Sequence, residues 1–502
     1  MKKNILFIII ALLGFSSCSD FLEPKSPSEY VPKSADALNE MLLGSAYSLS
    51  NHSAGEPLWA YHEIFSDDIE MTGVALDFTI SLDAFIALYS WDPDVNEKAT
   101  ERGQSVNIWA YFYKLIMATN AALDYLDDVK GSDNEKAYVR AQAYALRAFY
   151  YFHLVNIYGE PYMHNRKALG VPLKLVSDLT DGYDRQNTVE EVYCQILKDL
   201  DEAEKNFLAL PEGKQNSATY RINLPSVQLI RARVCLHMGD REGAAKYANK
   251  VIRDWGYQLN DLNSFVATAT KRNPDFVTLE NPETIWAFGN PDNVISLLRA
   301  TSGYWADGKT SSNALCASGA LINSYKTGDL RKDCYLMKVF SNNYKEVPGE
   351  YSPWSKMSAG SYNILAKNKF GLFLRLSEAY LILAEAVYDT DKELALKMVN
   401  DLRKKRYTES EYKEVDYSGQ ELLDFIREER RRELCFEGQR WFDLRRYGMP
   451  SFSRRWMEKG EYVGSYTIEK EDAAYTIPIP SVVLLRNPAL IQNKLGNRKT
   501  LN

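Results

Sequence analysis

Two short patterns in the sequence have the spacing of loops that bind phosphate or calcium. Residues Gly303 to Thr310 fit the pattern G-x-x-x-x-G-K-[ST], which cradles a phosphate when it joins a buried strand to a helix. Here the pattern lies in an irregular stretch and contains two bulky side chains, Tyr304 and Trp305. Because the strand and the helix are missing, we interpret it as a glycine-flanked surface turn.

Acidic residues in the first fifth of the chain suggest two other kinds of site. Residues 92–96 resemble the start of a calcium loop, but Pro93 interrupts it and Gly103 stands where the loop needs a bidentate glutamate. Asp67 and Asp68 could supply a glycosidase carboxylate, yet adjacent acids point in different directions and no partner across a sugar can be assigned. We therefore favour a capped or solvated turn at both places.

Other catalytic signatures are missing from the sequence. The five histidines stand at positions 52, 62, 153, 164 and 237, and none has the H-E-x-x-H spacing of a zinc enzyme. No C-x-x-C pair, G-x-S-x-G elbow or G-x-G-x-x-G turn occurs. The 502 residues carry 60 basic and 67 acidic side chains, so nothing favours a nucleic-acid partner. We expect no enzymatic activity, no resident metal and no cofactor.

Six cysteines are too few for a disulfide scaffold in a chain of this length. Cys316 and Cys334 are the pair that could form a bridge. We prefer to read both as small, buried apolar side chains.

The most informative stretch for structure runs from Ser418 to Gly448. Ser418 and Glu421 have the spacing of a capping box, which predicts the start of a helix, and Gly438 predicts a break before a second helix.

A run of seven charges follows at residues 427–433 and would ordinarily indicate a solvated face. However, Arg430 shares a helical stripe with Leu423 and Leu434, a face that must be buried. We therefore predict a structural ion network of Arg430, Glu433 and Glu437, because a stranded buried charge costs about 3–5 kcal/mol.

Helical spacing recurs along most of the chain. Ser132 with Glu135 and Thr188 with Glu191 predict two further capping boxes. Helical pairs are expected at about 104–159, 224–255, 372–405 and 421–447, with one extra helix near 188–207. Pairs of about 34 residues with small residues at their crossings are typical of tetratricopeptide-type repeats. We predict a mostly α fold, a solenoid of about four helical pairs with repeats at about 104–255 and 372–447.

Helical spacing fails between residues 257 and 371, where Asn, Pro, Gly, Ser and aromatic residues are frequent. So long an irregular insertion is usually functional, and we expect it to form a ligand-binding lobe. Flat rings can stack on sugar C–H groups or peptide side chains, and a few fixed polar groups can bind hydroxyls. The candidate ligand-binding residues are Asp67, Asp68, Trp91, Asn290, Tyr304, Trp305, Asp307 and Trp354.

The N-terminus has the pattern of an exported, lipid-anchored protein. Residues 1–17 combine a charged start with a short apolar run, as an export signal does. The sequence Phe15-Ser-Ser-Cys18 is similar to a bacterial lipobox and predicts lipidation of Cys18. Residues 18–33 would then form the lipidated N-terminus and tether, and residues 34–502 one domain.

Three motifs together resemble a known family. Glu429 to Leu444 fit E-R-x-x-E-L-x-x-E-G-x-R-W-x-D-L, and residues 475–480 and 487–493 are similar to terminal P-I-P and N-P-x-L-x-Q-N signatures. The run from Arg147 to Pro161 is similar to the same family's early helix and turn. These motifs resemble the SusD/RagB-like nutrient-binding outer-membrane lipoproteins of Bacteroidetes.

The resemblance implies a surface-exposed lipoprotein of the outer membrane. Such a protein captures oligosaccharides and acts as a lid on a SusC-like TonB-dependent transporter, with the repeat lobe facing the transporter. Two alternatives stay open on the residues: a peptide-binding, RagB-like uptake receptor, and a repeat scaffold of envelope proteins that binds no solute.

Overall fold

The computed structural model describes residues 32–48, 61–73, 82–101, 107–178, 182–216, 220–265, 278–289, 302–304, 311–313, 315–340, 346–352, 370–458 and 460–502. The export signal and Cys18 therefore lie outside the described residues, as does most of the predicted tether. Among the described helices, none has the length and apolar character that a bilayer crossing needs.

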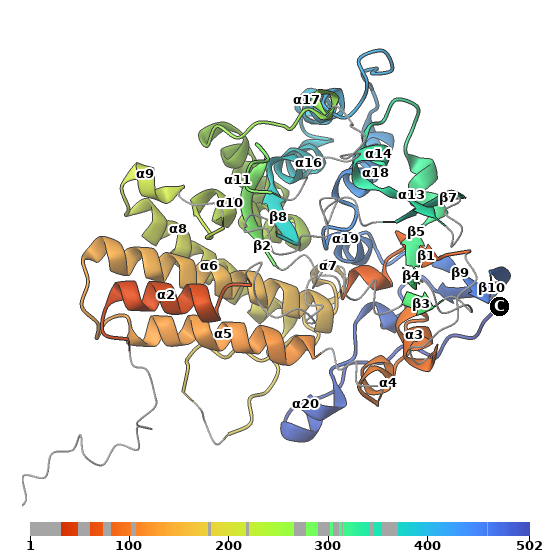
Figure 1. The fold of residues 1–502 in the computed structure, drawn as a ribbon. Helices are drawn as coiled ribbons and strands as arrows, with labels where there is room; N and C mark the ends of the chain where they lie inside the picture. Colours follow the sequence, from red (N-terminus) through yellow and green to blue (C-terminus); the bar gives the residue numbers. More distant parts are fainter. Residues whose placement is uncertain are drawn as a thin grey trace, which may run out of the picture.

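Helices packed one against the next form one side of the molecule (Figure 1). Helix α5 (Ile108–Tyr125) packs against α6 (Asp133–Tyr158), and α2 (Ala35–Ser45) lies against both. Helix α8 (Val189–Leu208) also packs against α6, and α10 (Leu224–Met238) packs against α8.

The series continues with α11 (Arg241–Asp254) against α10 and α16 (Leu376–Val387) against α11. Helices α17 (Lys392–Lys404) and α18 (Gly419–Leu434) both pack against α16, and α19 (Arg440–Arg446) follows after a turn. The expected helices are thus present, and the expectation of a mostly helical fold is confirmed.

Shorter helices complete the helical part of the described chain. They are η2 (Glu63–Phe65), α3 (Leu82–Tyr89), α4 (Val95–Glu101), α7 (Tyr162–Asn165), α9 (Glu212–Gln215), η3 (Leu262–Ser264), α13 (Gly319–Ser324), α14 (Arg331–Tyr335), η4 (Ala473–Tyr475) and α20 (Ser481–Arg486).

Side-chain caps explain where the longest helices begin. The side chains of Ser132 and Thr188 each accept a hydrogen bond from the backbone N–H three residues on. The glutamate at that position in turn accepts a hydrogen bond from the backbone N–H of the Ser or Thr, so both predicted capping boxes are confirmed. The box predicted at Ser418 is wrong, because its side chain caps no amide. Gly419 has a φ of +56°, which turns the chain out of the geometry that a cap requires. Gly438, with a φ of +73°, does form the predicted break between α18 and α19.

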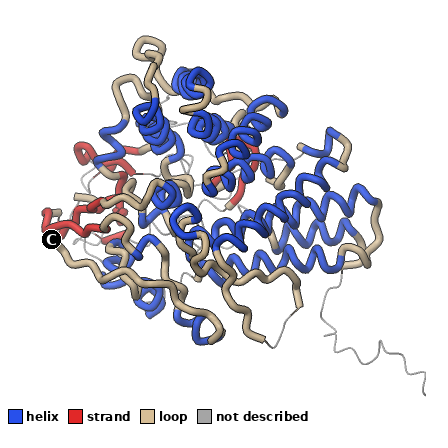
Figure 2. Tube along the Cα trace, turned by 180° about the vertical axis from the view of Figure 1, so that it is seen from behind, coloured by secondary structure: helices blue, strands red, loops and turns tan. Residues whose placement is uncertain are grey.

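Short antiparallel strand pairs lie mainly at the other end of the molecule, as Figure 2 shows. The pairs are β1 (Ile69–Met71) with β5 (Leu315–Ala317), β2 (Thr284–Phe288) with β8 (Leu372–Arg375), β3 (Ser302–Tyr304) with β4 (Ser311–Asn313), β6 (Met337–Phe340) with β7 (Glu346–Ser352), and β9 (Phe452–Glu458) with β10 (Glu461–Ile468). The described parts of the predicted irregular lobe therefore consist of two-stranded pairs and the short helices α13 and α14.

One expected helix boundary is wrong. The sequence suggested a helix from Leu372 onward, but residues 372–375 form the buried strand β8, and α16 begins at Leu376. All four side chains of β8 are buried against their surroundings, so tertiary packing decides between strand and helix here.

Candidate functional site

Three distant parts of the chain meet beside strand β1. Ile69 of β1 pairs with Ala317 of β5, so the early loop joins the insertion directly. The Oγ1 of Thr72 donates to a carboxylate oxygen of Glu350 on β7 at 2.6 Å. Arg455 of β9 pairs with the same carboxylate at 2.9 Å, which brings in the C-terminal hairpin. The regions that the sequence nominates for ligand binding therefore come together at one end of the fold.

Asp67 and Asp68 attach the early loop to α18 and α19. Both carboxylate oxygens of Asp67 accept from the guanidinium of Arg440, at 2.7 and 2.8 Å, and Asp68 accepts from Arg431 at 2.6 Å. Burial alone would raise the pKa of Asp67, but Arg440 and Arg431 outweigh it and lower the pKa to about 2. For Asp68, burial prevails and raises the pKa despite Arg431. In this structure the two carboxylates position a loop.

Trp91 is packed inside the fold. It is 3% exposed, its Nε1 donates to the carbonyl of Phe65 at 3.0 Å, and the guanidinium of Arg454 lies 4.0 Å from its ring centre. Phe452 meets the ring edge-on at 5.3 Å. A ring covered in this way presents no open face for stacking in this conformation. A small cleft beside Trp91 has a volume of about 10 Å³, room for one water but not for a sugar ring.

The other candidates cannot be placed in the same way. Asn290, Trp305, Asp307 and Trp354 lie outside the described residues, and only the backbone of Tyr304 is described, in β3 opposite Ser311. Contact between a ligand and any of the eight candidates stays a prediction.

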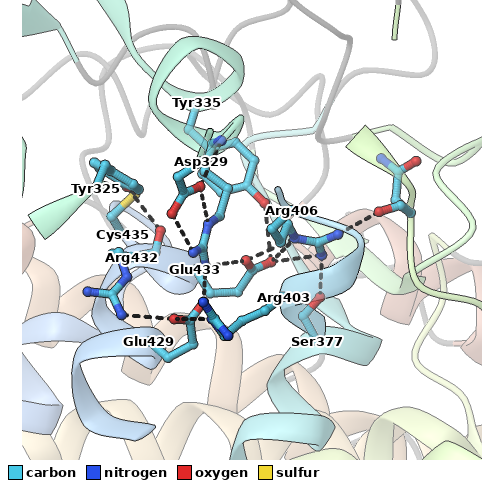
Figure 3. Close-up of polar contacts among 12 residues, drawn as sticks. Tyr325, Asp329, Tyr335, Ser377, Arg403, Arg406, Glu429, Arg432, Glu433 and Cys435 are labelled. Atoms are coloured by element: carbon cyan, nitrogen blue, oxygen red, sulfur yellow. Dashed lines mark hydrogen bonds and ion pairs between the residues drawn. The ribbon is translucent and has the colours of Figure 1, made fainter. Parts of the chain in front are cut away.

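A buried ion network links the strand-bearing end to the helices (Figure 3). It joins five arginines and five carboxylates: Arg331, Arg375, Arg403, Arg406, Arg432, Glu283, Asp329, Glu429, Glu433 and Glu437. Every one of these side chains is buried, and the formal charges of the set sum to zero. Desolvated charges are tolerated only with such complete pairing.

Glu433 of α18 is the centre of this network. Its carboxylate meets Arg375 at 2.5 Å, Arg406 at 2.9 Å and Arg331 at 3.1 Å, and it accepts from the hydroxyl of Tyr335 at 3.1 Å. Burial by itself raises the pKa of Glu433, but Arg406, Arg375 and Arg331 together hold it well below its usual value. The carboxylate is therefore ionised at neutral pH and holds α14, β8 and the segment after α17 together.

The predicted ion network is thus buried as expected, but the partners expected for Arg430 are wrong. Arg430 donates to Asp443 of α19 at 2.8 Å and lies 3.7 Å from Glu378 of α16. The carboxylate of Glu437 accepts hydrogen bonds from Nε and Nη2 of Arg375, at 2.9 and 2.8 Å. Residues three apart on a helix share a face, yet a long arginine side chain reaches across to the neighbouring helix, so spacing along α18 could not reveal its partner.

Sequence reasoning missed most of the network because its partners are distant in sequence. Arg331 lies in α14 within the insertion, Arg375 lies in β8, and Arg406 follows α17. The one available signal was the run of charges on a helical face that had to be buried.

These charged groups are suited to holding structure rather than to chemistry. Arginines cannot give up a proton near neutral pH, and carboxylates of depressed pKa cannot take one. Within the described ranges, no group of three or more His, Cys, Asp or Glu side chains has the arrangement of a metal site. Cys316 and Cys334 are both buried and do not form a disulfide bridge with each other, as preferred from the sequence.

The fold and site define a mostly helical protein in which a strand-bearing end is held to a helical stack by buried ion pairs. The family model described as the SusD family matches residues 341–496, and a second, described as starch-binding associating with outer membrane, matches residues 20–234. Both models describe SusD-type proteins, so the chain is similar to the SusD/RagB family over residues 20–234 and 341–496. Proteins of that family are binding proteins and not enzymes.

Individual relatives resemble the chain over its whole length. SusD-like protein P2 of Formosa agariphila is 25% identical, in a match that covers 99% of this chain and all of the relative. Among solved structures, a SusD superfamily protein of Bacteroides thetaiotaomicron is 23% identical with a TM-score of 0.70, covering 92% of this chain and 100% of that one. A putative sugar binding protein of Bacteroides vulgatus is 24% identical with a TM-score of 0.69, covering 93% and 99%. These structures show that the fold is shared.

Proposed function

We propose that the protein is a cell-surface lipoprotein that binds oligosaccharides and serves as lid and partner of a SusC-like TonB-dependent transporter in nutrient uptake. The observation that carries the proposal is the pair of family matches, one of them to a family described as starch-binding and associated with the outer membrane. A structural relative in Bacteroides vulgatus also bears the name of a sugar binding protein.

The arrangement of the chain supports a division of labour between its two ends. The early loop, the insertion and the C-terminal hairpin converge beside β1, which gives a ligand several chain segments to contact. On this proposal the lobe at about 257–371 holds the glycan. The stack of paired helices acts as a tetratricopeptide-like solenoid that faces the transporter, and the lipid on Cys18 anchors the chain.

The candidate contacts on this proposal are the rings and polar groups of the insertion. Asn290 stands two residues after the end of β2 in the sequence, and Trp354 stands two residues after the end of β7. Trp305 and Asp307 belong to the segment that joins β3 to β4. An indole face and an acceptor on neighbouring segments are what recognition of a sugar ring requires.

Isothermal titration of the mature chain, from residue 19 onward, against a panel of soluble oligosaccharides tests the proposal. We expect saturable binding to at least one glycan. The variants Trp305→Ala and Trp354→Ala should each weaken it by about tenfold, the value of one lost stacking contact. Tyr183→Ala, which removes an exposed ring elsewhere, is the matched control and should bind like the wild type.

Each alternative predicts a different result. Saturable binding to peptides alone would show that the ligand is a peptide, as in a RagB-like receptor, and not a glycan. Stable complexes with several soluble envelope proteins, without binding of either solute, would indicate a scaffold. Co-purification with an outer-membrane barrel protein would support the proposal that a transporter is the partner. If the chain acts without a transporter, no barrel protein should co-purify with it.

A further inference from the structure

An apolar surface is exposed around the short helix α20. Val482 and Leu485 stand three residues apart on its outer face, 42% and 83% exposed, whereas Val483 and Leu484 turn inward against the core. In Figure 1, α20 protrudes at the lower edge of the molecule. An aliphatic side chain exposed as fully as Leu485, on a protruding helix, has no packing role within the chain.

Two neighbouring segments extend this surface. The side chain of Gln186 exchanges two hydrogen bonds with the backbone of Ile491, at 2.8 and 3.0 Å, and Asn487 donates to the carbonyl of Asp184 at 2.8 Å. These bonds hold residues 183–187 beside the chain that follows α20. The exposed side chains of Tyr183 and Ile491, each 62% exposed, therefore join Val482 and Leu485 in what we call the α20 surface.

The C-terminal segment that carries most of the α20 surface is basic, although Glu97 accepts a hydrogen bond from the backbone of Ser481 at 3.2 Å. Residues 481–502 contain four basic side chains and no Asp or Glu, although the whole chain has a net charge of −7. Arg498 and Lys499 pair with Asp94 and Asp472. Arg486 and Lys494 are exposed and form no ion pair with any described residue. Two cations thus remain beside the apolar side chains to meet an anionic partner.

The tether limits how far this surface can be from a bilayer. Residues 19–31 separate Cys18 from the first described residue, and 13 extended residues reach at most about 45 Å. The described chain begins at residue 32, and a backbone bridge joins Ser34 to Lys130 at this end. In Figure 1 the start of the described chain before α2 and the helix α20 both lie in the lower half of the molecule. A lipid on Cys18 would keep the α20 surface near anionic headgroups.

We infer that the α20 surface is a second membrane contact, which inserts Leu485 and its apolar neighbours among anionic lipid headgroups while Arg486 and Lys494 bind their phosphates. The inference rests on the proposed anchoring of the chain at the outer membrane. Aliphatic and tyrosine side chains with flanking cations are the composition of interfacial contacts. The acyl chains on Cys18 would anchor the protein but leave its orientation free, whereas a second contact through the α20 surface would fix that orientation at the membrane.

Co-sedimentation of the mature, unlipidated chain with vesicles tests this inference. All described elements lie after residue 31, so this form retains them. We expect binding to vesicles of phosphatidylethanolamine and phosphatidylglycerol at 3:1, and weaker binding to phosphatidylcholine vesicles. The double variant Val482→Ser/Leu485→Ser should lower the partition coefficient by at least about tenfold. The variant Arg486→Gln/Lys494→Gln should lower it about tenfold or more on anionic vesicles only.

Leu208→Ser provides the matched control, because Leu208 is 55% exposed on α8 outside the α20 surface. It should bind vesicles like the wild type, and all variants should unfold at the same denaturant concentration. Absence of binding to the anionic vesicles, or binding that the Val482/Leu485 variant retains, overturns the inference. Loss of co-purification with a barrel protein in that variant, without vesicle binding by the wild type, would assign the surface to a protein partner instead.

The glycan titration separates this inference from the proposed function. The Val482/Leu485 variant should bind oligosaccharide like the wild type, because the α20 surface is not part of the candidate ligand site. Vesicle binding without any glycan binding would remove the proposed cargo and leave the membrane contact standing.

Discussion

The substitution Glu433→Gln tests whether the buried ion network holds the two ends of the molecule together. Glutamine keeps the size and shape of the side chain but removes its charge. Five arginines then face four carboxylates in a region without solvent access, so the network carries a net charge of +1. Any loss of stability therefore reports on charge pairing and not on packing.

The contacts that survive set the size of the effect. Arg331 keeps Asp329 and Arg375 keeps Glu437, and Arg406 keeps a carboxylate of Glu283 at 2.6 Å. Breaking a buried pair costs about 3–5 kcal/mol when it strands a charge. Because each arginine retains a partner here, we expect the lower end, a loss of about 3 kcal/mol in the free energy of unfolding.

The pH dependence follows from the depressed pKa of Glu433. A carboxyl with a lower pKa in the folded state contributes stability that is present above its unfolded pKa of about 4.5 and is lost as the pH falls toward the folded value. The difference in unfolding free energy between wild type and Glu433→Gln should therefore be largest at pH 7 and shrink below about pH 4.5.

Urea unfolding followed by circular dichroism and by tryptophan fluorescence measures the difference. Glu421→Gln is the matched control, because Glu421 is exposed on the same helix and caps nothing. It should change stability by less than about 0.5 kcal/mol. A Glu433→Gln protein within 1 kcal/mol of the wild type at pH 7, or a difference that does not shrink in acid, would refute this account of the network.

Four further substitutions are predicted. Burial raises the pKa of Glu63 to about 8, so its carboxyl destabilises the fold increasingly as the pH rises from about 4.5 to 8. Glu63→Gln should therefore be more stable than the wild type by about 5 kcal/mol at pH 9 and similar to it near pH 4.5. The same difference in unfolding free energy at both pH values, measured by urea unfolding, would contradict this prediction. Ser132→Ala should lose about 1 kcal/mol of stability and Ser418→Ala less than 0.5, because only the first caps its helix. Asp67→Asn should lower the free energy of unfolding by about 2 kcal/mol, because it weakens the hydrogen bonds with Arg440. Weaker glycan binding with unchanged stability would instead show that Asp67 contacts the ligand.

The helical part of the fold could be predicted from the sequence because its signals are local. Capping boxes at Ser132 and Thr188 and the break at Gly438 each depend on residues within one helical turn, and all three appear in the structure. The failures at Ser418 and at β8 have different origins. Gly419, which lies inside the Ser418–Glu421 box, adopts a left-handed conformation, whereas the strand at β8 is set by its pairing with the distant strand β2.

The candidate site could be predicted only as a region. Composition identified the insertion, and β1 pairing with β5 brings the nominated early loop to it. The individual residues were harder, because sequence does not distinguish an aromatic or acidic side chain that faces a ligand from one that fixes a loop. Trp91 lies under Arg454, and Asp67 is bound by Arg440, whose position is 373 residues away in the chain. No local pattern carries such information.

The strand-bearing end needs directional contacts because its described strands occur only in pairs. A two-stranded pair is marginally stable alone and offers little apolar area for fixing its orientation. A buried ion pair adds little net stability over apolar packing, but it is satisfied in few geometries, so a mispositioned lobe would leave charges unpaired. Glu433 binds arginines from α14, from β8 and from the segment after α17, and Asp67 ties the early loop to the start of α19. Buried charge is therefore the device that sets how this lobe sits on the helical stack.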